Sequence, residues 1–486
     1  MKKILVSILA AVAVASAAAQ TQAAYFMEGT TFRSRFNPAF APLRGYFNIP
    51  GISGIALNTD GGLSLDAVVK RNRHGEFTSI LSPSVSAGQA LAGLSRGMNS
   101  LNANSTVNIL GFGMYARNRK SFWSVDVNAH VETAFDVPYE FFDFIKNGNS
   151  NSIRGMQVCL DTYVDVGFNY SMPLNDRLYV GARVKFLVGL ARAQMQLDRM
   201  DVSLRDELWY ATAAAHMDFY SNGSVVKVKD DGEFDSFEFG MGGPAGYGAA
   251  IDLGATYDVL ENLQVSLAVN DLGFISWKKS AAYNFATTSQ TITFGGVDVD
   301  VEGDGAGGVQ TSTGDVDFSL EDMKFMQGES RGATRMVRAT VNAGVEYEVW
   351  RHKVGLGLLY HARMGGYKSS HNLTASVNFH PVRWFTLTPS YTFNNNSAHA
   401  VGLALNLCPN WINLFLATDM LLSRHGRYFI PYKQSRMNFT FGVGVPIGRR
   451  SFRIDEYVKE SEYIDYACRE ARRAQRRADR ASRRAD

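Results

Sequence analysis

The segment Val341-Asn-Ala-Gly-Val-Glu-Tyr-Glu-Val349 decides the fold. Its odd positions carry valine, alanine and tyrosine, whereas its even positions carry asparagine, glycine and two glutamates. Successive side chains of a β-strand point to opposite faces, so this strand has one apolar and one polar face. A helix of the same sequence would scatter the glutamates among the apolar residues. The segment therefore predicts a strand with one face toward lipid or a core and the other toward water.

The same alternation recurs along the chain, for example at residues 125–131, 162–170, 263–269, 373–379 and 437–445. A soluble β-sandwich would also alternate in this way. We predict fourteen strands, which lie at residues 46–69, 104–117, 120–133, 157–172, 177–195, 246–258, 262–277, 335–349, 352–364, 369–381, 384–394, 397–408, 411–423 and 434–448.

The lengths of the connections favour a membrane barrel over a sandwich. Every second connection is a tight turn of a few residues, and the intervening ones include long segments near 70–103, 134–156, 196–245 and 278–334. Bacterial outer-membrane barrels have this asymmetry, with short periplasmic turns and long outer loops. We therefore expect an all-β, antiparallel up-and-down barrel in the outer membrane, with both termini in the periplasm and lipid as its surroundings.

The first residues predict export. Lys2 and Lys3 precede an apolar run from Ile4 to Ala15, and small residues at 17–19 offer an A-x-A cleavage site. This pattern is typical of a secretory signal peptide, which we place at residues 1–19. Beyond it we find no apolar stretch long enough for a membrane helix, so a helical membrane protein is excluded.

Two segments lie outside the predicted barrel of residues 51–448. Residues 20–50 contain Pro38, Pro42 and Pro50, which a single regular strand would not tolerate, and we expect a plug-like segment there. Residues 449–486 are rich in arginine, and alanines at spacings of four and three follow one face of a helix. This basic tail either binds a periplasmic partner or the cell wall, or it is solvated.

Three stretches carry a resemblance to a known family: Tyr25-Phe-Met-Glu-Gly-Thr30, Arg35-Phe-Asn-Pro-Ala-Phe-Ala-Pro-Leu-Arg-Gly-Tyr46 and Asn270-Asp-Leu-Gly-Phe-Ile-Ser-Trp277. Over essentially the whole mature chain, the sequence resembles a family of Bacteroidota outer-membrane barrels without an assigned function.

The short element Asn37-Pro38-Ala39 also resembles the hatch of the long-chain fatty-acid transporter barrels, which have fourteen strands and an N-terminal plug. This resemblance implies a plug at Asn37, Pro38 and Ala39. It also implies a route for hydrophobic small molecules or another role in the envelope.

Charge and motifs exclude several classes of protein. The chain has 49 Lys and Arg against 46 Asp and Glu, a formal net charge of +3, which implies no nucleic-acid partner. Cys159, Cys408 and Cys468 are far apart and do not form a disulfide framework. No pattern typical of catalysis, a metal site or a cofactor occurs, so we expect neither an enzyme nor a cofactor or metal protein.

Strand parity assigns a set of charged residues to the lumen. They form either structural ion-pair ladders or the lining of a polar passage. These residues are Asp126, Asp165, Arg183, Lys185, Arg338, Glu346, Glu348, Lys353 and Arg363.

Pro389 lies inside the predicted strand 384–394 and faces lipid by parity. A closed barrel has no free edge for a residue that lacks an N–H, so we expect the ladder to be broken or bulged there. The residue is a candidate lateral opening, guarded by a plug anchored around Asn37 and Pro38. The alternative is a local bulge that only bends the strand.

Two functions remain open from the sequence. The first is passive transport of hydrophobic or amphipathic small molecules through a plugged barrel. The second is a structural or secretion-associated barrel that binds protein partners through its loops or tail. An apolar pocket between plug and wall would favour the first function, and a filled lumen with large ordered loops would favour the second.

Overall fold

The computed structural model describes residues 22–451 and residue 475, except for residues 28, 52–53, 64–68, 72–76, 80–84, 148–150, 205–207, 224–225, 238–241, 296–323, 351–352, 366–368, 383, 395–398, 410 and 420–436. The predicted signal peptide and nearly all of the Arg-rich tail lie outside these residues. Within the described part of the chain, no helix is long and apolar enough to cross a membrane.

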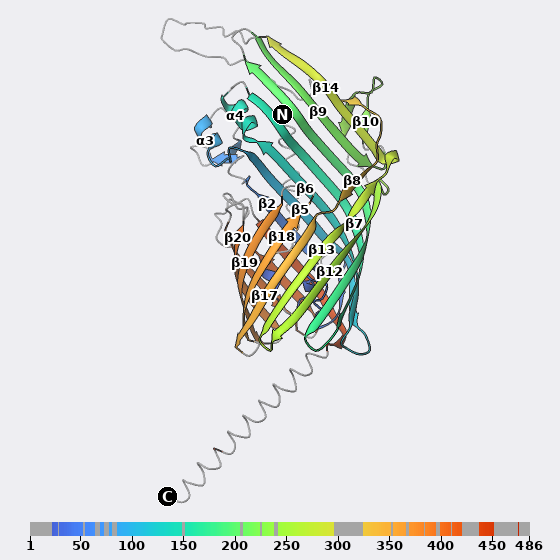
Figure 1. The fold of residues 1–486 in the computed structure, drawn as a ribbon, viewed down its shortest axis with the longest axis vertical. Helices are drawn as coiled ribbons and strands as arrows, with labels where there is room; N and C mark the ends of the chain where they lie inside the picture. The colour runs from blue at the N-terminus through green and yellow to red at the C-terminus, as the bar shows by residue number, and fades with distance from the viewer. Residues whose placement is uncertain are drawn as a thin grey trace, which may run out of the picture.

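The main sheet closes on itself as an antiparallel barrel, which confirms the predicted fourteen-stranded fold (Figure 1). The first position is shared by β1 (Arg44–Asn48) and β2 (Ile55–Gly61), and both pair with the second and last strands. The others are β5 (Met98–Tyr115), β6 (Phe122–Pro138), β7 (Asn151–Pro173), β8 (Leu178–Leu204), β12 (Gly246–Leu260), β13 (Leu263–Trp277), β17 (Ala339–Trp350), β18 (Val354–Met364), β19 (Ser370–Val382), β20 (Phe385–Asn394), β21 (Ala400–Leu407), β22 (Asn413–Thr418) and β23 (Met437–Arg450).

The prediction of one continuous strand over 46–69 is wrong, because the structure has two shorter strands there, β1 and β2. Pro50 and Gly51 lie between the two pieces. Proline has no N–H for the ladder, and Gly51 has a φ of +80°, a left-handed conformation that interrupts an extended strand.

The two faces of the wall follow the predicted alternation. On β17, Val345 and Val349 point outward and are 41% and 55% exposed, whereas Asn342 and Gly344 are buried toward the lumen. The outward residues of the neighbouring strands are also mostly apolar and exposed. A lipid-facing exterior around a polar interior is the pattern of a transmembrane barrel.

The long segments predicted as loops contain strand residues as well. The first part of β8, from Leu178 to Gly189, pairs with β12. From Ala191 onward, β8 pairs instead with β9 (Leu208–Ser221), and β9 pairs with β14 (Ala282–Gly295). These strands continue the wall beyond the barrel on one side, as Figure 1 shows. We call this part the outer extension, the barrel end beside it the loop end, and the opposite end the turn end.

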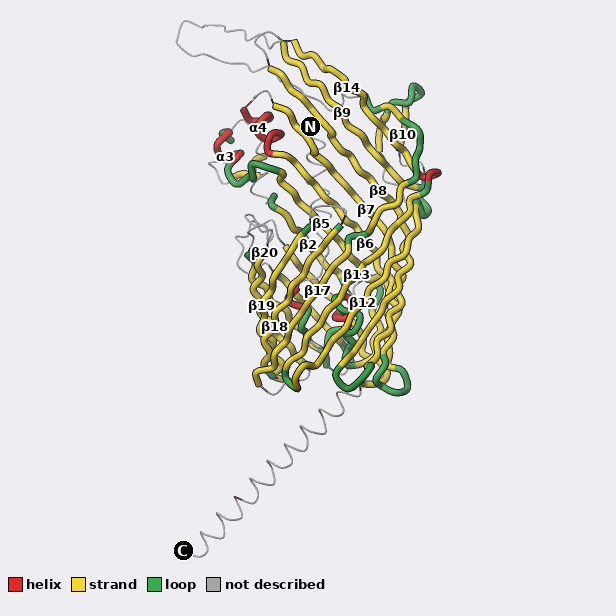
Figure 2. The backbone as a smooth tube through the Cα atoms, viewed as in Figure 1, coloured by secondary structure: helices red, strands yellow, loops and turns green. Residues whose placement is uncertain are grey.

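The outer extension has its own hydrophobic core, which explains why it is ordered. Ile153, Met200, Met217 and Phe285 are buried there, and Phe144 packs against them. The structure also contains smaller elements, of which Figure 2 labels α3, α4 and β10. They are β3 (Val69–Arg71), β4 (Phe77–Ser79), α3 (Ala87–Leu91), α4 (Tyr139–Asn147), β10 (Val226–Val228), β11 (Phe234–Phe237), η3 (Lys279–Ala281), β15 (Met326–Gln327) and β16 (Ala333–Met336).

Candidate functional site: the plug and its anchors

The described residues of the segment 22–43 lie inside the barrel and form a plug with a small hydrophobic core. Two 3-10 turns, η1 (Gln22–Ala24) and η2 (Arg33–Arg35), help to fold the segment. The ring of Tyr25 makes edge contacts with Phe26, Phe36 and Phe40 at centroid distances of 4.9, 5.7 and 5.2 Å. Edge-to-face contacts of this kind stabilise aromatic clusters. The plug is therefore a packed unit rather than an extended strand.

Glycines on the lumen face of the wall make room for the plug. A Cβ atom built on Gly181 would overlap the backbone of Pro38, and one on Gly254 would overlap the side chain of Asn37. A Cβ on Gly357 would lie 2.5 Å from the ring of Phe26. Wall and plug thus fit each other at van der Waals contact, and we call these glycines the plug seat.

Asparagine side chains of the wall hold the plug backbone. The Nδ2 atoms of Asn270 and Asn342 both donate to the carbonyl oxygen of Phe36, each at 2.8 Å. Asn169 Nδ2 donates to the carbonyl oxygen of Pro38 at 3.4 Å. Buried carbonyl groups without partners are costly, so these amides replace the hydrogen bonds that an irregular segment cannot make with itself.

Asn37 of the predicted plug element makes the reciprocal contacts. Its Nδ2 atom donates to the carbonyl oxygens of Ala255 and Leu267 in β12 and β13, at 3.2 and 3.4 Å. Its Oδ1 atom accepts from the backbone N–H of Ala39 at 2.9 Å, which holds the turn around Pro38. The predicted plug residues therefore lie against the wall that β7, β8, β12 and β13 form.

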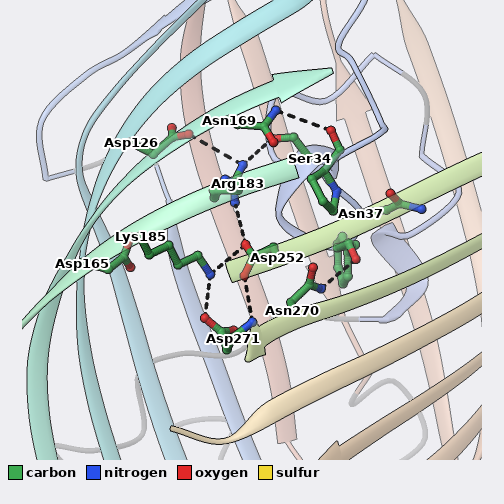
Figure 3. A network of polar contacts seen from close by, with 12 residues as sticks. Ser34, Asn37, Asp126, Asp165, Asn169, Arg183, Lys185, Asp252, Asn270 and Asp271 are labelled. Atoms are coloured by element: carbon green, nitrogen blue, oxygen red, sulfur yellow. Dashed lines mark hydrogen bonds and ion pairs between the residues drawn. The ribbon is translucent and has the colours of Figure 1, made fainter. Parts of the chain in front are cut away.

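An ion network in the wall reaches the plug through Arg183 (Figure 3). The guanidinium of Arg183 lies 3.8 Å from a carboxylate oxygen of Asp126 and 3.8 Å from one of Asp252, and it donates to Ser34 Oγ at 3.2 Å. All of these groups are buried. Buried charges need partners to offset the cost of desolvation, and here the carboxylates supply them.

Lys185 extends the network along β8. Its Nζ atom lies 2.9 Å from Asp252 and 2.6 Å from Asp271. Asp271 has a positive φ of 60°, and its backbone N–H donates to the side-chain Oδ1 atom of Asp252, in the neighbouring strand β12, at 2.7 Å. The ladder between β12 and β13 shifts register at this point, so the bulge turns an additional carboxylate toward the lumen.

Asp165 belongs to a second group on β5, β6 and β7. His130 Nε2 and Asn128 Nδ2 both contact its carboxylate, and Thr106 Oγ1 lies 3.1 Å from His130 Nδ1. The side chains come from three adjacent strands and face the lumen together. Asp165 therefore has dedicated polar partners, as a structural buried carboxylate requires.

Of the remaining predicted lumen residues, two have an ion-pair partner described here, and two are placed by their burial and strand face. Glu346 lies 3.8 Å from Arg33 of the plug, and Arg363 lies 3.3 Å from Glu132 of β6. Arg338 is buried at the loop end of the lumen, and Glu348 lies half-buried on the lumen face of β17, whose alternation it follows.

Lys353 is the predicted lumen residue that the structure contradicts. It lies in the turn before β18, is exposed, and places its Nζ atom 5.6 Å from the ring centroid of Trp350. Parity describes which face a strand residue occupies but does not locate the end of the strand. A lysine beyond the last rung turns outward to water and aromatic surface.

The sequence did not single out Asp252, Asp271 or His130. Asp252 has the lumen parity of its predicted strand, so the same rule would have found it. The parity rule could not have predicted Asp271, because the bulge reverses which face the following residues occupy. Asn270 is the first residue of the motif Asn270–Trp277, but nothing in the local sequence indicates that it binds the plug.

The backbone around Pro389 has an interrupted ladder. Pairing of β20 with β19 stops after Ser376 and Ser390 and resumes at Phe379 and Leu387, so Pro389 has no partner in β19. On the other side, β20 pairs with β21 through the same residues without a gap. The predicted break is thus present on one side of the strand.

The plug region behind this gap differs from the predicted one. Asn37 and Pro38 contact the wall of β7, β8, β12 and β13, whereas η1 lies against β19, β20, β21 and β22. Gln22 of η1 accepts a hydrogen bond from Thr374 Oγ1 at 3.3 Å, and Thr374 Oγ1 lies 2.9 Å from Thr392 Oγ1. The part of the plug that packs against the two strands of the gap is therefore η1 and not the segment around Asn37 and Pro38.

No ligand cluster for a metal ion was found: among the described residues, no group of three or more His, Cys, Asp or Glu is placed to hold one.

Comparison with solved structures finds distant similarity to barrels. A Pseudomonas aeruginosa FadL homologue is 8% identical with a TM-score of 0.41, over 87% of this chain and 94% of that chain. The Pseudomonas putida toluene transporter TodX is 9% identical with a TM-score of 0.35, over 89% and 93%. A TodX deltaS2S3 mutant monoaromatic hydrocarbon channel is 11% identical with a TM-score of 0.41, over 90% and 96%.

Comparison with curated proteins gives no match. A family model, described as a family of unknown function (DUF5723), matches residues 38–419, which include all of the wall from β1 to β22 and part of the plug. Because this match covers well over half of the chain, the protein belongs to the family of unknown function DUF5723.

Proposed function

We propose that this protein is an outer-membrane barrel that takes up hydrophobic or amphipathic small molecules passively, with its loop end outside the cell. The observation that carries the proposal is the gap in the β19–β20 ladder beside Pro389, in two strands that η1 of the plug packs against. An apolar molecule that leaves the lumen sideways enters lipid without crossing a layer of water, which is favourable for apolar surface.

Two lumen-facing hydroxyl groups next to the gap support this location. Thr388 Oγ1 and Ser390 Oγ are buried and have no hydrogen-bond partner. Such groups cost free energy when they are left unpaired, so the packing at this point is not optimised for a sealed wall.

The plug leaves a small apolar cavity against the wall, which also supports transport. Its lining includes Phe32 and Phe36 of the plug and Ala56 and Phe415 of the wall, together with the polar residues Thr30, Arg35 and Thr440. The cavity volume is about 10 Å³, roughly the space that one water molecule needs. Cargo therefore requires a shift of the plug, and this conformation is the closed one.

The proposal is tested by restoring the missing donor. Pro389→Val gives β20 an N–H at the gap, so uptake of an apolar fluorescent probe such as N-phenylnaphthylamine should fall several-fold at equal surface abundance. Pro446→Val is the matched control, because Pro446 lies in β23, where pairing with β1 is continuous around it. Uptake equal to that of the parent in both variants would reject Pro389 as an exit.

The outer extension favours a second function, a barrel that binds a protein partner at the cell surface. β9 and β14 pair beyond the barrel and rest on a buried core, so this surface is ordered without contributing to the membrane wall. Deletion of the gene would distinguish the two functions. Normal uptake of apolar probes, together with loss of a cross-linked surface complex, would favour the partner-binding function.

A further inference from the structure

A polar cavity lies in the lumen between the plug and the loop end. On β18, the plug contacts Gly357 near the start of the strand, whereas His361 and Arg363 of the cavity lie toward its end. We call this cavity the polar chamber. The side chains that matter here are Asn58, Asn104, Arg338, His361, Arg363 and Asn372.

Two hydrogen-bond acceptors in the polar chamber are unsatisfied. Asn58 and Asn104 are direct partners in the β2–β5 ladder, so their side chains lie next to each other. The Oδ1 atom of each is buried without a hydrogen-bond partner, although the residues are only 9% and 4% exposed. Leaving two adjacent buried carbonyl groups unpaired is costly, and a donor from a bound molecule would remove that cost.

The opposite side of the polar chamber offers donors. Arg338 is buried there, and Arg363 is held in place by Glu132 at 3.3 Å. A guanidinium presents five N–H donors and no acceptor. His361 is oriented by Asn342, which lies 2.7 Å from its Nδ1 atom. A bound group must therefore accept on one side and donate on the other.

This combination requires a group that both donates and accepts, which excludes simple ions and alkyl chains and leaves neutral groups such as hydroxyl and amide. A carboxylate accepts from arginine but cannot donate to Asn58 or Asn104, and an ammonium group donates to the asparagines but cannot accept from arginine. An alkyl chain does neither. A hydroxyl group both donates and accepts, and neighbouring hydroxyl groups on a sugar ring do so repeatedly.

We propose that the polar chamber is a binding site for a hydroxyl-rich ligand of the sugar type. The enclosed volume is about 10 Å³, within a hollow of about 260 Å³ that includes open solvent. One hydroxyl group is held between the asparagines and the arginines, and the rest of the ring lies in the open part. The proposal is independent of a lateral exit, so Pro389→Val leaves binding in the polar chamber unchanged.

The test is titration calorimetry of the purified, folded barrel in an amine-oxide detergent, because a glycoside detergent would itself compete. The probes are D-glucose, sodium acetate as an acceptor without donors, and methylammonium chloride as a donor without acceptors. We expect a binding heat with glucose alone. Acetate or methylammonium binding as tightly as glucose, or no binding of glucose, would overturn the proposal.

Variants then locate the site. Asn58→Leu and Asn104→Leu each remove one acceptor at similar volume, and each should weaken glucose binding about tenfold, the effect of one hydrogen bond. Asn378→Leu is the control, because Asn378 is a buried lumen amide on β19 that bonds to Glu346 near the turn end. Heat-modifiable gel migration checks that each variant folds. Equal glucose affinity in all three variants would place the sugar elsewhere.

Discussion

Asn270 in β13 donates a hydrogen bond to the backbone oxygen of Phe36 in the plug, at 2.8 Å between Nδ2 and O. The two residues are 234 positions apart in the chain, yet each belongs to one of the motifs that distinguish this sequence. The contact shows why both motifs occur together: one is the plug turn and the other is the wall that holds it. The plug is thus attached to the wall through its backbone.

Asn270→Leu removes one of the two amides that bind the Phe36 carbonyl. We expect a loss of about 0.5–1.5 kcal/mol in the free energy of unfolding, because one buried hydrogen bond is lost while the Phe36 oxygen keeps its bond to Asn342. Urea unfolding in detergent measures it. The double change with Asn342→Leu should be non-additive, since both amides share one acceptor. Strictly additive losses would show that the two bonds act separately.

Gly181→Ala places a methyl group where the backbone of Pro38 lies. The plug must move, so we expect a folded barrel with higher ion conductance in planar bilayers and a stability loss of about 1–3 kcal/mol. Gly97→Ala is the control, because a Cβ there has no atom within 4 Å. Unchanged conductance in Gly181→Ala would mean that the plug yields without opening a path.

Lys185→Met leaves the carboxylates of Asp252 and Asp271 without their nearest cation. Removing one partner of a buried ion pair costs about 3–5 kcal/mol, and we expect a decrease of that order in chemical unfolding. Adding Asp252→Asn should restore much of the loss, because it removes one uncompensated charge. A double variant as unstable as Lys185→Met would contradict the assignment of this pair.

Val345→Arg should impair folding into lipid vesicles far more than Glu348→Arg. An arginine on the lipid face near the membrane midplane costs about 2–4 kcal/mol, and one in the lumen costs much less. Glu346 is a poorer comparison, because it lies 3.8 Å from Arg33 and its replacement breaks a plug contact. Equal folding yields for the two variants would mean that the faces of β17 are assigned incorrectly.

Alternation predicted the wall because each strand of a closed barrel has one apolar outer face and one polar inner face. Val345 and Asn342 show their faces locally, without knowledge of any partner. β9 and β14 escaped prediction because they lie in the outer extension, where the strands do not separate a polar lumen from an apolar exterior. Their order comes instead from contacts among residues such as Met217 and Phe285, which are distant in sequence.

The site was predictable only in part, for a related reason. Parity placed Arg183 and Asp126 in the lumen, but it could not pair Arg183 with Ser34, which depends on how the plug folds. The irregular plug has no periodicity to read. Its contacts with Asn169 and Gly254 follow from the three-dimensional fit alone.

The tight fit of the plug seat has a consequence for how the barrel closes. Pro38 and Asn37 fill the space at Gly181 and Gly254, so the plug and the wall leave no room for a side chain between them at these positions. The plug also directly precedes β1, which pairs with β23 to close the barrel. The segment that fills the lumen is therefore continuous with the strand that closes the wall, and the closing pair of strands places the plug inside the barrel.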